Sequence, residues 1–245
     1  MNTRFAFAGT LILLVVLISA VWRFWGMRKP LGATHTVESR LAEFGEQARA
    51  RLEPFFSEAG VPYPGDSVTL VAVKDARRLE LYAAPSGGTP RHIRDYTILG
   101  ASGGPGPKLL EGDRQVPEGI YGVELLNPNS RFHVSLRVNY PNAQDRVWAE
   151  REGRQRPGSD IMIHGSDASI GCLAMGDLVA EELFTLAALV GCAKVRLLFC
   201  PTDFRSNPGF APPAGAPEWV SALYEELRAA VQRLTHGSVQ GTSGL

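Results

Sequence analysis

The sequence has few cysteines, no excess charge of either sign and neither an SxxK nor an HExxH motif. Its three cysteines, Cys172, Cys192 and Cys200, form no CxxC pair, so neither a disulfide framework nor a cysteine zinc site is predicted. The 25 basic and 25 acidic side chains leave no basic surface for phosphates, which argues against nucleic-acid binding. SxxK and HExxH are absent, and the five histidines lack metal-ligand spacing, so we expect no metal site.

The remaining composition is that of a globular protein. Hydrophobic residues make up 44% of the 245 residues, which is enough to bury a core in one domain or slightly more, and this excludes wholesale disorder. The segment Gly100–Pro107, GASGGPGP, superficially resembles a phosphate-binding loop. It lacks the GK[ST] ending, and its prolines oppose the helix that must follow, so it does not predict a nucleotide site.

One long apolar segment lies near the N-terminus. Phe5–Trp22 contains 18 residues without a charge and is flanked by Arg4 and Arg23. At about 1.5 Å per residue it spans roughly 27 Å, close to the thickness of a bilayer core. We therefore expect a transmembrane anchor or uncleaved signal over residues 1–29, with the C-terminal part exported. A weakly cleaved signal peptide and a buried core helix are the alternatives.

The rest of the chain alternates between helical and extended patterns. Apolar residues at helical spacing predict an amphipathic helix over Thr36–Ser57, which Thr36 caps and which Pro54 ends or bends. A second, apolar helix is expected from Asp177, as its cap, to Val190, and a third over Glu218–Leu234. Extended patterns predict strands over Val68–Val73, Leu79–Ala83, Tyr96–Leu99, Ile120–Leu125, Phe132–Tyr140, Ile161–Ile163 and Val195–Phe199.

A histidine and a cysteine bracket one small-residue loop. The strand Ile161–Ile163 ends at His164, and Cys172 follows eight positions later. Such a loop can fold back so that the imidazole reaches the sulfur, the pairing that a thiol nucleophile requires. Gly171 permits close backbone approach and can help to shape an oxyanion site. On spacing alone, a small buried Cys172 and a satisfied core His164 are an equally good interpretation.

These residues and several motifs before them resemble the catalytic (YkuD) domain of L,D-transpeptidases, and in detail its YafK-like branch. A papain-like protease is disfavoured, because there the cysteine precedes the histidine. The motifs that carry the resemblance occur in the family's order and are Leu79-Glu80-Leu81-Tyr82, Gly106-Pro107-Lys108, Gly112-Asp113, Pro117-Glu118-Gly119-Ile120-Tyr121, Leu126-Asn127-Pro128-Asn129-Ser130, Tyr140-Pro141-Asn142 with Asp145, His164-Gly165, and Ser169-Ile170-Gly171-Cys172-Leu173-Ala174-Met175.

The resemblance implies an α+β fold, with a β-rich catalytic domain and packed helices. The domain covers residues 66–205, after a linker and helix over 30–65 and before a proline-rich connection, helix and tail over 206–245. The resemblance makes Cys172 the nucleophile and His164 its base, oriented by the carbonyl of Gly165, with Gly171 and Ser169 in the oxyanion loop. It implies no cofactor.

The resemblance also implies a substrate and a location. The substrate is peptidoglycan, attacked at the L-centre of meso-diaminopimelate in a stem peptide to give a thioester, and a wall-linked lipoprotein is a further expected partner. The expected location is the cell envelope: anchored in the inner membrane with the catalytic domain in the periplasm, or periplasmic if the signal is cleaved. His133, Arg137 and Tyr140 on one strand are candidate substrate contacts, although a solvated strand face is equally consistent with them.

Two departures from the family affect the expected reaction. Many members have His-Gly-Cys and an arginine two residues after the cysteine, where this chain has Ile170 and Ala174. The loss of a polar group and a cation weakens recognition of a charged acceptor, so hydrolysis is expected to exceed cross-linking. The alternatives are an L,D-transpeptidase that forms 3–3 cross-links or attaches protein to the wall, and a catalytically idle wall-binding protein.

Overall fold

The computed structural model describes residues 34–234, which from Thr36 on form one compact unit. The predicted membrane segment Phe5–Trp22 and the tail after Leu234 lie outside these residues. Across residues 34–234, no helix combines the length and the apolar character needed to cross a membrane.

A helical segment precedes the sheet. It consists of α2 (Val37–Arg40), a π-helical turn η1 (Leu41–Gly45) and α3 (Glu46–Glu58). Thr36 caps it as predicted, because its hydroxyl accepts the Ser39 N–H and the Ser39 hydroxyl accepts the Thr36 N–H. Pro54 does not end the helix, which continues to Glu58. Its buried side recurs every four residues at Phe44, Ala48, Leu52 and Phe56.

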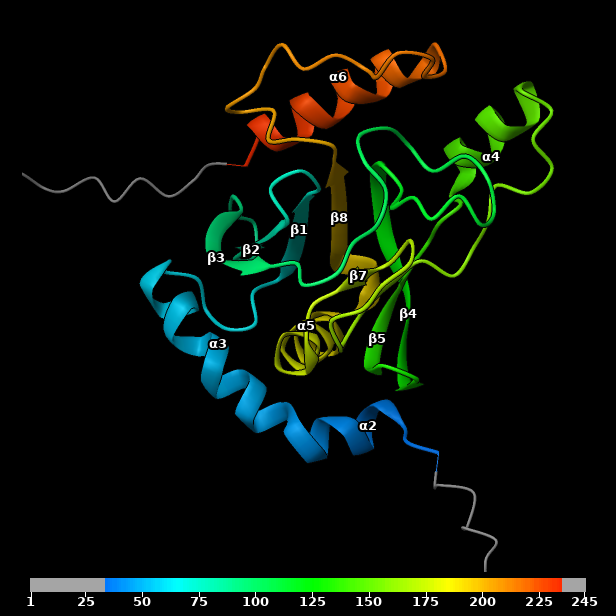
Figure 1. Ribbon diagram of the computed structural model, residues 1–245. Helices are drawn as coiled ribbons and strands as arrows, with labels where there is room; N and C mark the ends of the chain where they lie inside the picture. The colour runs from blue at the N-terminus through cyan, green and yellow to red at the C-terminus, as the bar shows by residue number, and fades with distance from the viewer. Residues whose placement is uncertain (1–33, 235–245) are drawn as a thin grey trace, which may run out of the picture. The chain divides into compact units, whose positions relative to one another are not determined.

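An eight-stranded sheet forms the centre of the molecule (Figure 1). Its spatial order is β3-β2-β1-β8-β4-β5-β6-β7, with β1 and β8 paired in parallel at the centre. The strands are β1 (Ser67–Val73), β2 (Arg78–Ala84), β3 (Arg91–Thr97), β4 (Gly119–Ser130), β5 (His133–Val138), β6 (Met162–His164), β7 (Leu173–Ala174) and β8 (Val195–Cys200).

The sheet curls so that its last strand meets the segment that follows β3. Ala174 of β7 bridges to Gly100, and the Leu99 N–H donates to the Ala174 carbonyl over 2.9 Å. This contact brings the glycine-rich segment that begins at Gly100 beside the loop that carries Cys172. Every predicted strand is present, although β3 begins five residues earlier than expected and the two-residue strand β7 was not predicted.

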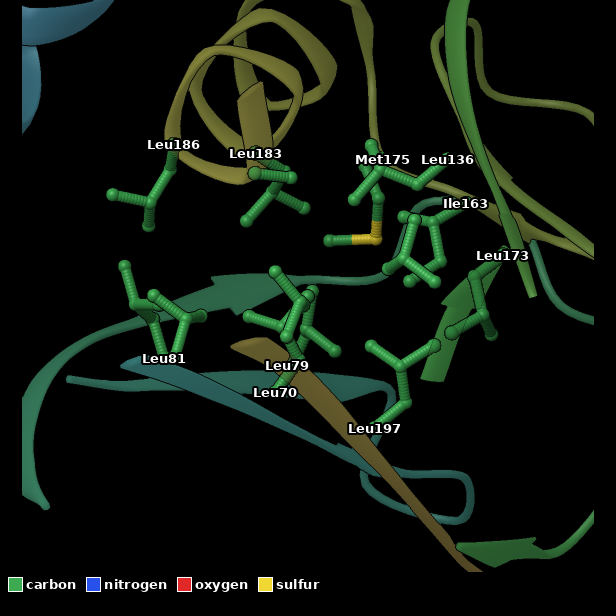
Figure 2. Close-up of a cluster of buried hydrophobic side chains, with 14 of the residues drawn as sticks. Leu70, Leu79, Leu81, Leu136, Ile163, Leu173, Met175, Leu183, Leu186 and Leu197 are labelled. Atoms are coloured by element: carbon green, nitrogen blue, oxygen red, sulfur yellow. The ribbon is translucent and has the colours of Figure 1, made fainter. Parts of the chain in front are cut away.

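Helices cover both faces of the sheet, as predicted for an α+β fold. On one face, α5 (Asp177–Val190) and α3 enclose the main core, where Leu183 and Leu186 of α5 face Leu70, Leu79 and Leu81 of the sheet (Figure 2). On the other face, α6 (Trp219–Gln232) packs against the alternate residues of the same strands, among them Val71, Val73 and Leu198. The central strands are therefore buried on both sides.

Two helix starts differ from the prediction. Helix α4 (Ala143–Arg151) was not predicted, although the Asn142 side chain accepts the Asp145 N–H and the Asp145 carboxylate accepts the Asn142 N–H. Gly176, rather than Asp177, occupies the N-cap of α5. The Asp177 carboxylate instead accepts the Ser166 N–H over 2.8 Å, which ties the helix to the loop after His164.

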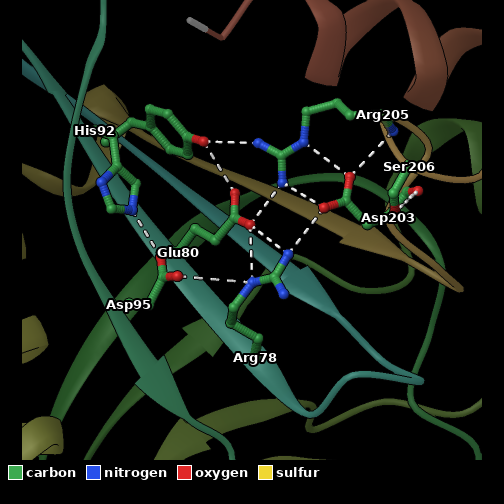
Figure 3. A network of polar contacts seen from close by, with 8 residues as sticks. Arg78, Glu80, His92, Asp95, Asp203, Arg205 and Ser206 are labelled. Carbon is green, nitrogen blue, oxygen red and sulfur yellow. Dashed lines mark hydrogen bonds and ion pairs between the residues drawn. The ribbon is translucent and has the colours of Figure 1, made fainter. Parts of the chain in front are cut away.

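A buried carboxylate, that of Glu80, links strand β2 to residues that follow β8 (Figure 3). Glu80 of β2 accepts hydrogen bonds from Arg78, Arg205 and the Tyr82 hydroxyl, and Asp203 pairs with both arginines. Burial opposes ionisation of Glu80, but the hydrogen bonds from Arg205 and Arg78 outweigh it and lower its pKa. The network joins β2 to the segment that follows β8.

Asp145 makes folding stability depend on pH. Burial raises its pKa from 3.8 to about 6, so the folded protein holds this proton more tightly than the unfolded chain. The resulting stability is present below pH 4 and is lost as pH rises through about 6, and each pKa unit is worth about 1.4 kcal/mol. Asp145→Asn mimics the protonated form, so it is expected to remove this loss of stability, which is about 3 kcal/mol for a shift of roughly two pKa units.

Urea unfolding at pH 4 and pH 7.5 measures the effect. The difference in unfolding free energy between Asp145→Asn and wild type should shift in favour of the variant at the higher pH. Asp75→Asn, in an exposed turn, controls for loss of a carboxylate. A constant difference between variant and wild type at the two pH values would contradict the assignment.

Candidate active site

The register of three strands places the predicted nucleophile and base on one face of the sheet. Ser135 and Arg137 of β5 pair with His164 and Met162 of β6, and paired residues present their side chains on the same face. The alternate residues Leu136, Ile163 and Leu173 point into the core. Cys172 precedes Leu173 and therefore lies on the same side as Met162, whose N–H donates to Cys172 Sγ over 3.3 Å.

His164 is buried and fixed in orientation. Its Nδ1 lies 2.6 Å from the Gly165 carbonyl oxygen, the contact that the family resemblance implied. Because a carbonyl only accepts, Nδ1 carries the proton and Nε2 keeps its lone pair. The Phe132 ring stacks on the imidazole, with the ring centroids 4.6 Å apart and the planes at 25°. Burial lowers the pKa of His164, so the ring is neutral at pH 7 and able to accept a proton.

The Cys172 thiol is protonated in this arrangement. Burial raises its pKa, and the thiol donates to the Asp160 carbonyl oxygen over 3.6 Å. Among the hydrogen bonds of residues 34–234, none joins the His164 ring to Cys172 Sγ. Cys172 and His164 therefore share a face as two neutral groups, and a reaction at the sulfur would require the thiol proton to move first.

Two serine hydroxyls accept from the backbone amides beside the nucleophile. The Gly171 N–H donates to Ser102 Oγ over 2.7 Å, and the Cys172 N–H donates to Ser169 Oγ over 3.1 Å. Gly171 adopts φ +85°, which favours glycine. These amides are the donors that the sequence predicted for an oxyanion site, and in the structure both are occupied by serine hydroxyls.

The segment over residues 100–118 forms one wall of the site. Lys108 Nζ donates to Asp113 Oδ1 and the Leu110 carbonyl, which folds the middle of the segment back on itself. The Ser102 hydroxyl donates to the Arg114 carbonyl over 2.6 Å. Tyr140 is buried, and its hydroxyl lies within hydrogen-bond distance of the Lys108 and Pro157 carbonyls. The side chains of Lys108 and Tyr140 thus stabilise the conformation of this segment through hydrogen bonds.

Gly165 lies where no side chain fits. A Cβ atom there would approach Asp177 Oδ1 and the Phe132 carbonyl oxygen to 2.4 and 2.7 Å. The Gly165 N–H donates to that same Phe132 carbonyl over 3.0 Å. The close packing between the β4–β5 hairpin and the start of α5 therefore sets the position of the carbonyl that orients His164.

The structure brings six of the eight predicted site residues together. Cys172, His164, Gly165, Gly171, Ser169 and Arg137 lie on or beside the face described above. His133 points away to α5, where its Nε2 lies 3.0 Å from Glu181. Tyr140 is buried, as described. Neither side chain faces the nucleophile, and the predicted substrate-contacting strand face is only partly solvated, because Ser135 is buried.

Sequence reasoning missed several residues of the site. Phe132, Ser102 and Asp160 contact His164, Gly171 and Cys172 from other segments of the chain. Phe132 is the first residue of the predicted strand Phe132–Tyr140, but its exposure and its stacking on His164 follow only from the hairpin. Among residues 34–234, no three His, Cys, Asp or Glu side chains are grouped so as to hold a metal ion.

Comparison with known proteins confirms the resemblance at the level of sequence. The chain is 35% identical over 142 residues to the Escherichia coli K12 protein named "Putative L,D-transpeptidase YafK", and equally to that of strain O157:H7. The alignment covers 56% of this chain and 55% of the relative. The chain thus spans about half the length of the curated relatives it matches. No family model matches the sequence.

Solved structures show more distant similarity. The helical cell shape determining protein Pgp2 of Campylobacter jejuni is 22% identical, with a TM-score of 0.45, over 62% of this chain and 55% of that one. Bd1075 of Bdellovibrio bacteriovorus is 19% identical, with a TM-score of 0.41, over 68% and 55%. L,D-transpeptidase 1 of Mycobacterium tuberculosis is 15% identical, with a TM-score of 0.32, over 55% and 62%.

We expect the Phe132 ring to keep the pKa of His164 low. Because its ring covers the imidazole, Phe132→Ala should readmit water to His164 and raise the pKa of the ring toward the ordinary value. NMR titration of the histidine side chains measures this shift directly. Val147→Ala removes a comparably exposed apolar side chain from α4 and is the matched control. An unchanged His164 titration in Phe132→Ala would show that the stacking does not control hydration of the ring.

Proposed function

We propose that this protein is an envelope cysteine enzyme of the L,D-transpeptidase type that acts on peptidoglycan stem peptides. The observation that carries the proposal is the placement of Cys172 and His164 on one sheet face, with Nδ1 held by the Gly165 carbonyl and Nε2 left as the base. The sequence relationship to YafK supports the same reaction class. A neutral imidazole, a thiol and two backbone amides are the groups that acyl transfer requires.

The reaction begins with proton transfer from the Cys172 thiol to Nε2 of His164. The sulfur then attacks the carbonyl carbon at the L-centre of meso-diaminopimelate, and the carbonyl oxygen becomes an oxyanion bound by the Gly171 and Cys172 amides. Collapse of this intermediate breaks the peptide bond, and His164 returns its proton to the departing amine. A thioester remains on Cys172, and either water or an amine resolves it.

Hydrolysis is the favoured outcome, including release of protein linked to the wall. Ala174 takes the place of the arginine that many relatives have, and it is fully buried against Gly100. Ile170 replaces a histidine and is 72% exposed. The nucleophile's own loop therefore supplies no cation to hold a charged acceptor, which gives water the advantage in resolving the thioester.

Two other functions remain as alternatives. In one, the protein is an L,D-transpeptidase that forms 3–3 cross-links or attaches a lipoprotein to the wall. In the other, it binds the wall without turnover. The first predicts new dimers in treated cell wall, and the second predicts no change in the wall. Intact Cys172 and His164 favour turnover, since a binding module needs neither.

The proposed location is the envelope, with the catalytic domain in the periplasm. Phe5–Trp22 would anchor the protein in the inner membrane, or it would direct export and be cleaved. Fractionation of the full chain tests this proposal. We expect it with the membranes, or as a mature form that begins near Val21, and the full chain found entirely in the soluble cytoplasm would contradict the envelope assignment.

Turnover is expected to depend on both members of the pair. Cys172→Ala should abolish it, and His164→Ala should reduce it by about 10²–10⁴-fold, the usual contribution of general-base assistance. The assay is mass analysis of muropeptides after incubation of purified cell wall with the full-length protein. It separates cleaved stems and released protein from new 3–3 dimers.

Cys192→Ala is the matched control for this experiment. Cys192 is also a half-buried free thiol, but it lies in η2 (Cys192–Lys194), away from the active face. Circular dichroism verifies that each variant is folded. Full activity of Cys172→Ala would refute the mechanism, while abundant 3–3 dimers without release of linked protein would reverse the proposed direction.

A further inference from the structure

Three charged side chains form a cluster beside the nucleophile. Arg137 Nη2 lies 3.0 Å from Asp160 Oδ1, and Arg137 Nε lies 3.1 Å from Glu124 Oε2. Glu124, Arg137 and Asp160, here called the charge cluster, come from β4, β5 and the loop before β6. One guanidinium between two carboxylates gives the cluster a formal charge of −1.

The cluster is joined to the nucleophile through the backbone. The Asp160 carbonyl accepts from the Cys172 thiol, while the Asp160 carboxylate holds Arg137. Arg137 pairs directly with Met162, whose N–H donates to Cys172 Sγ. Arg137 and Asp160 therefore lie next to the two backbone groups that contact Cys172 Sγ.

The cluster is poorly explained as a stabilising device. The side chains of Glu124 and Asp160 are 52% and 66% exposed, and ion pairs in water contribute only about 0–1 kcal/mol. Arg137 Nε is buried and makes no aligned hydrogen bond, although Glu124 is near. A β-bulge between Val123 and Leu125 locates Glu124, and Asp160 adopts φ +59°, which is uncommon for a residue other than glycine.

The arrangement of charges selects a ligand that carries both signs. A simple anion meets two carboxylates, and a simple cation meets the guanidinium. A free α-amino-acid centre provides a carboxylate for Arg137 and an ammonium for Glu124 or Asp160. We infer that the charge cluster binds a free α-amino-acid centre of the substrate. On the proposed function, on which this identification rests, that centre is the D-centre of meso-diaminopimelate in the donor stem.

This assignment gives Arg137 a role in binding the donor stem, which differs from the role of the missing arginine in binding a charged acceptor. The cation expected after the nucleophile is missing, but Arg137 reaches the same face from β5. Because Asp160 links Arg137 to the backbone that contacts Cys172, binding at the cluster would orient the donor carbonyl toward the sulfur. Arg137 is therefore a specificity-determining residue for the donor.

Binding to the full-length Cys172→Ala protein tests the inference without turnover. The first probe is a stem tripeptide that ends in meso-diaminopimelate with a free D-centre, and the second is the same peptide with that centre N-acetylated and amidated. Calorimetry should show at least tenfold tighter binding of the first probe. Adding Arg137→Gln should remove the difference, whereas Arg131→Gln, an exposed arginine in the β4–β5 hairpin, should preserve it.

Glu124→Gln is a second variant at an exposed position, so it is expected to fold. It should weaken binding of the free probe and leave the blocked probe unaffected. Equal binding of the two probes, or discrimination that survives Arg137→Gln in a folded protein, would overturn the inference. Discrimination by Cys172→Ala, together with no turnover of cell wall by the wild type, would support the cluster and refute the proposed function. Turnover of cell wall by the wild type without discrimination between the two probes would support the proposed function and refute the role of the cluster.

Discussion

A buried ion pair between Lys74 and Glu118 holds together the parts of the molecule on which the site depends. Lys74 Nζ lies 2.9 Å from Glu118 Oε1 and also donates to the Gly106 and Val116 carbonyls. Glu118 accepts the Gly106 N–H with one oxygen and the Tyr224 hydroxyl with the other. The pair thus ties the end of β1, the segment over residues 100–118 and α6 together. Removing one partner would leave the other charged and buried, which typically costs about 3–5 kcal/mol.

The segment over residues 100–118 sets part of the geometry of the site. Gly106 is fixed by Glu118, and Ser102, four residues earlier, accepts the Gly171 N–H beside the nucleophile. The curl of the sheet supplies the second constraint, because the bridge from Gly100 to Ala174 fixes where β7 begins and therefore where Cys172 lies. The position of the nucleophile is thus a property of the whole sheet rather than of its own loop.

The sequence signals that succeeded were local, and those that failed depended on tertiary contacts. Strict alternation after Phe132 and the apolar run before His164 predicted β5 and β6, whereas the α+β class was implied by the family resemblance. Strand β7 has two residues and hence no periodicity, so only its bridge to Gly100 defines it. Helix α4 was missed although the residues of its capping box, Asn142 and Asp145, were present, because its apolar residues do not recur on one helical face. Pairing of Ser102 with Gly171 joins residues 69 positions apart, and no local pattern reports such a contact.

The protonation states bear on how the half-buried Cys172 thiol could serve the proposed reaction. A thiolate–imidazolium pair would place two charges in a partly buried site, at a desolvation cost that neutral groups avoid. Burial here favours the neutral form of Cys172 and the neutral form of His164 alike. In the proposed reaction, charge would develop only when a carbonyl carbon is present to receive the sulfur and its oxygen replaces the serine hydroxyls at the Gly171 and Cys172 amides. Because the proton passes between two neutral groups on one face, the site needs no permanent cation next to the sulfur. On the proposed function, the charged side chains beside Cys172 would therefore be available for recognition of the substrate, and in the charge cluster they carry both signs.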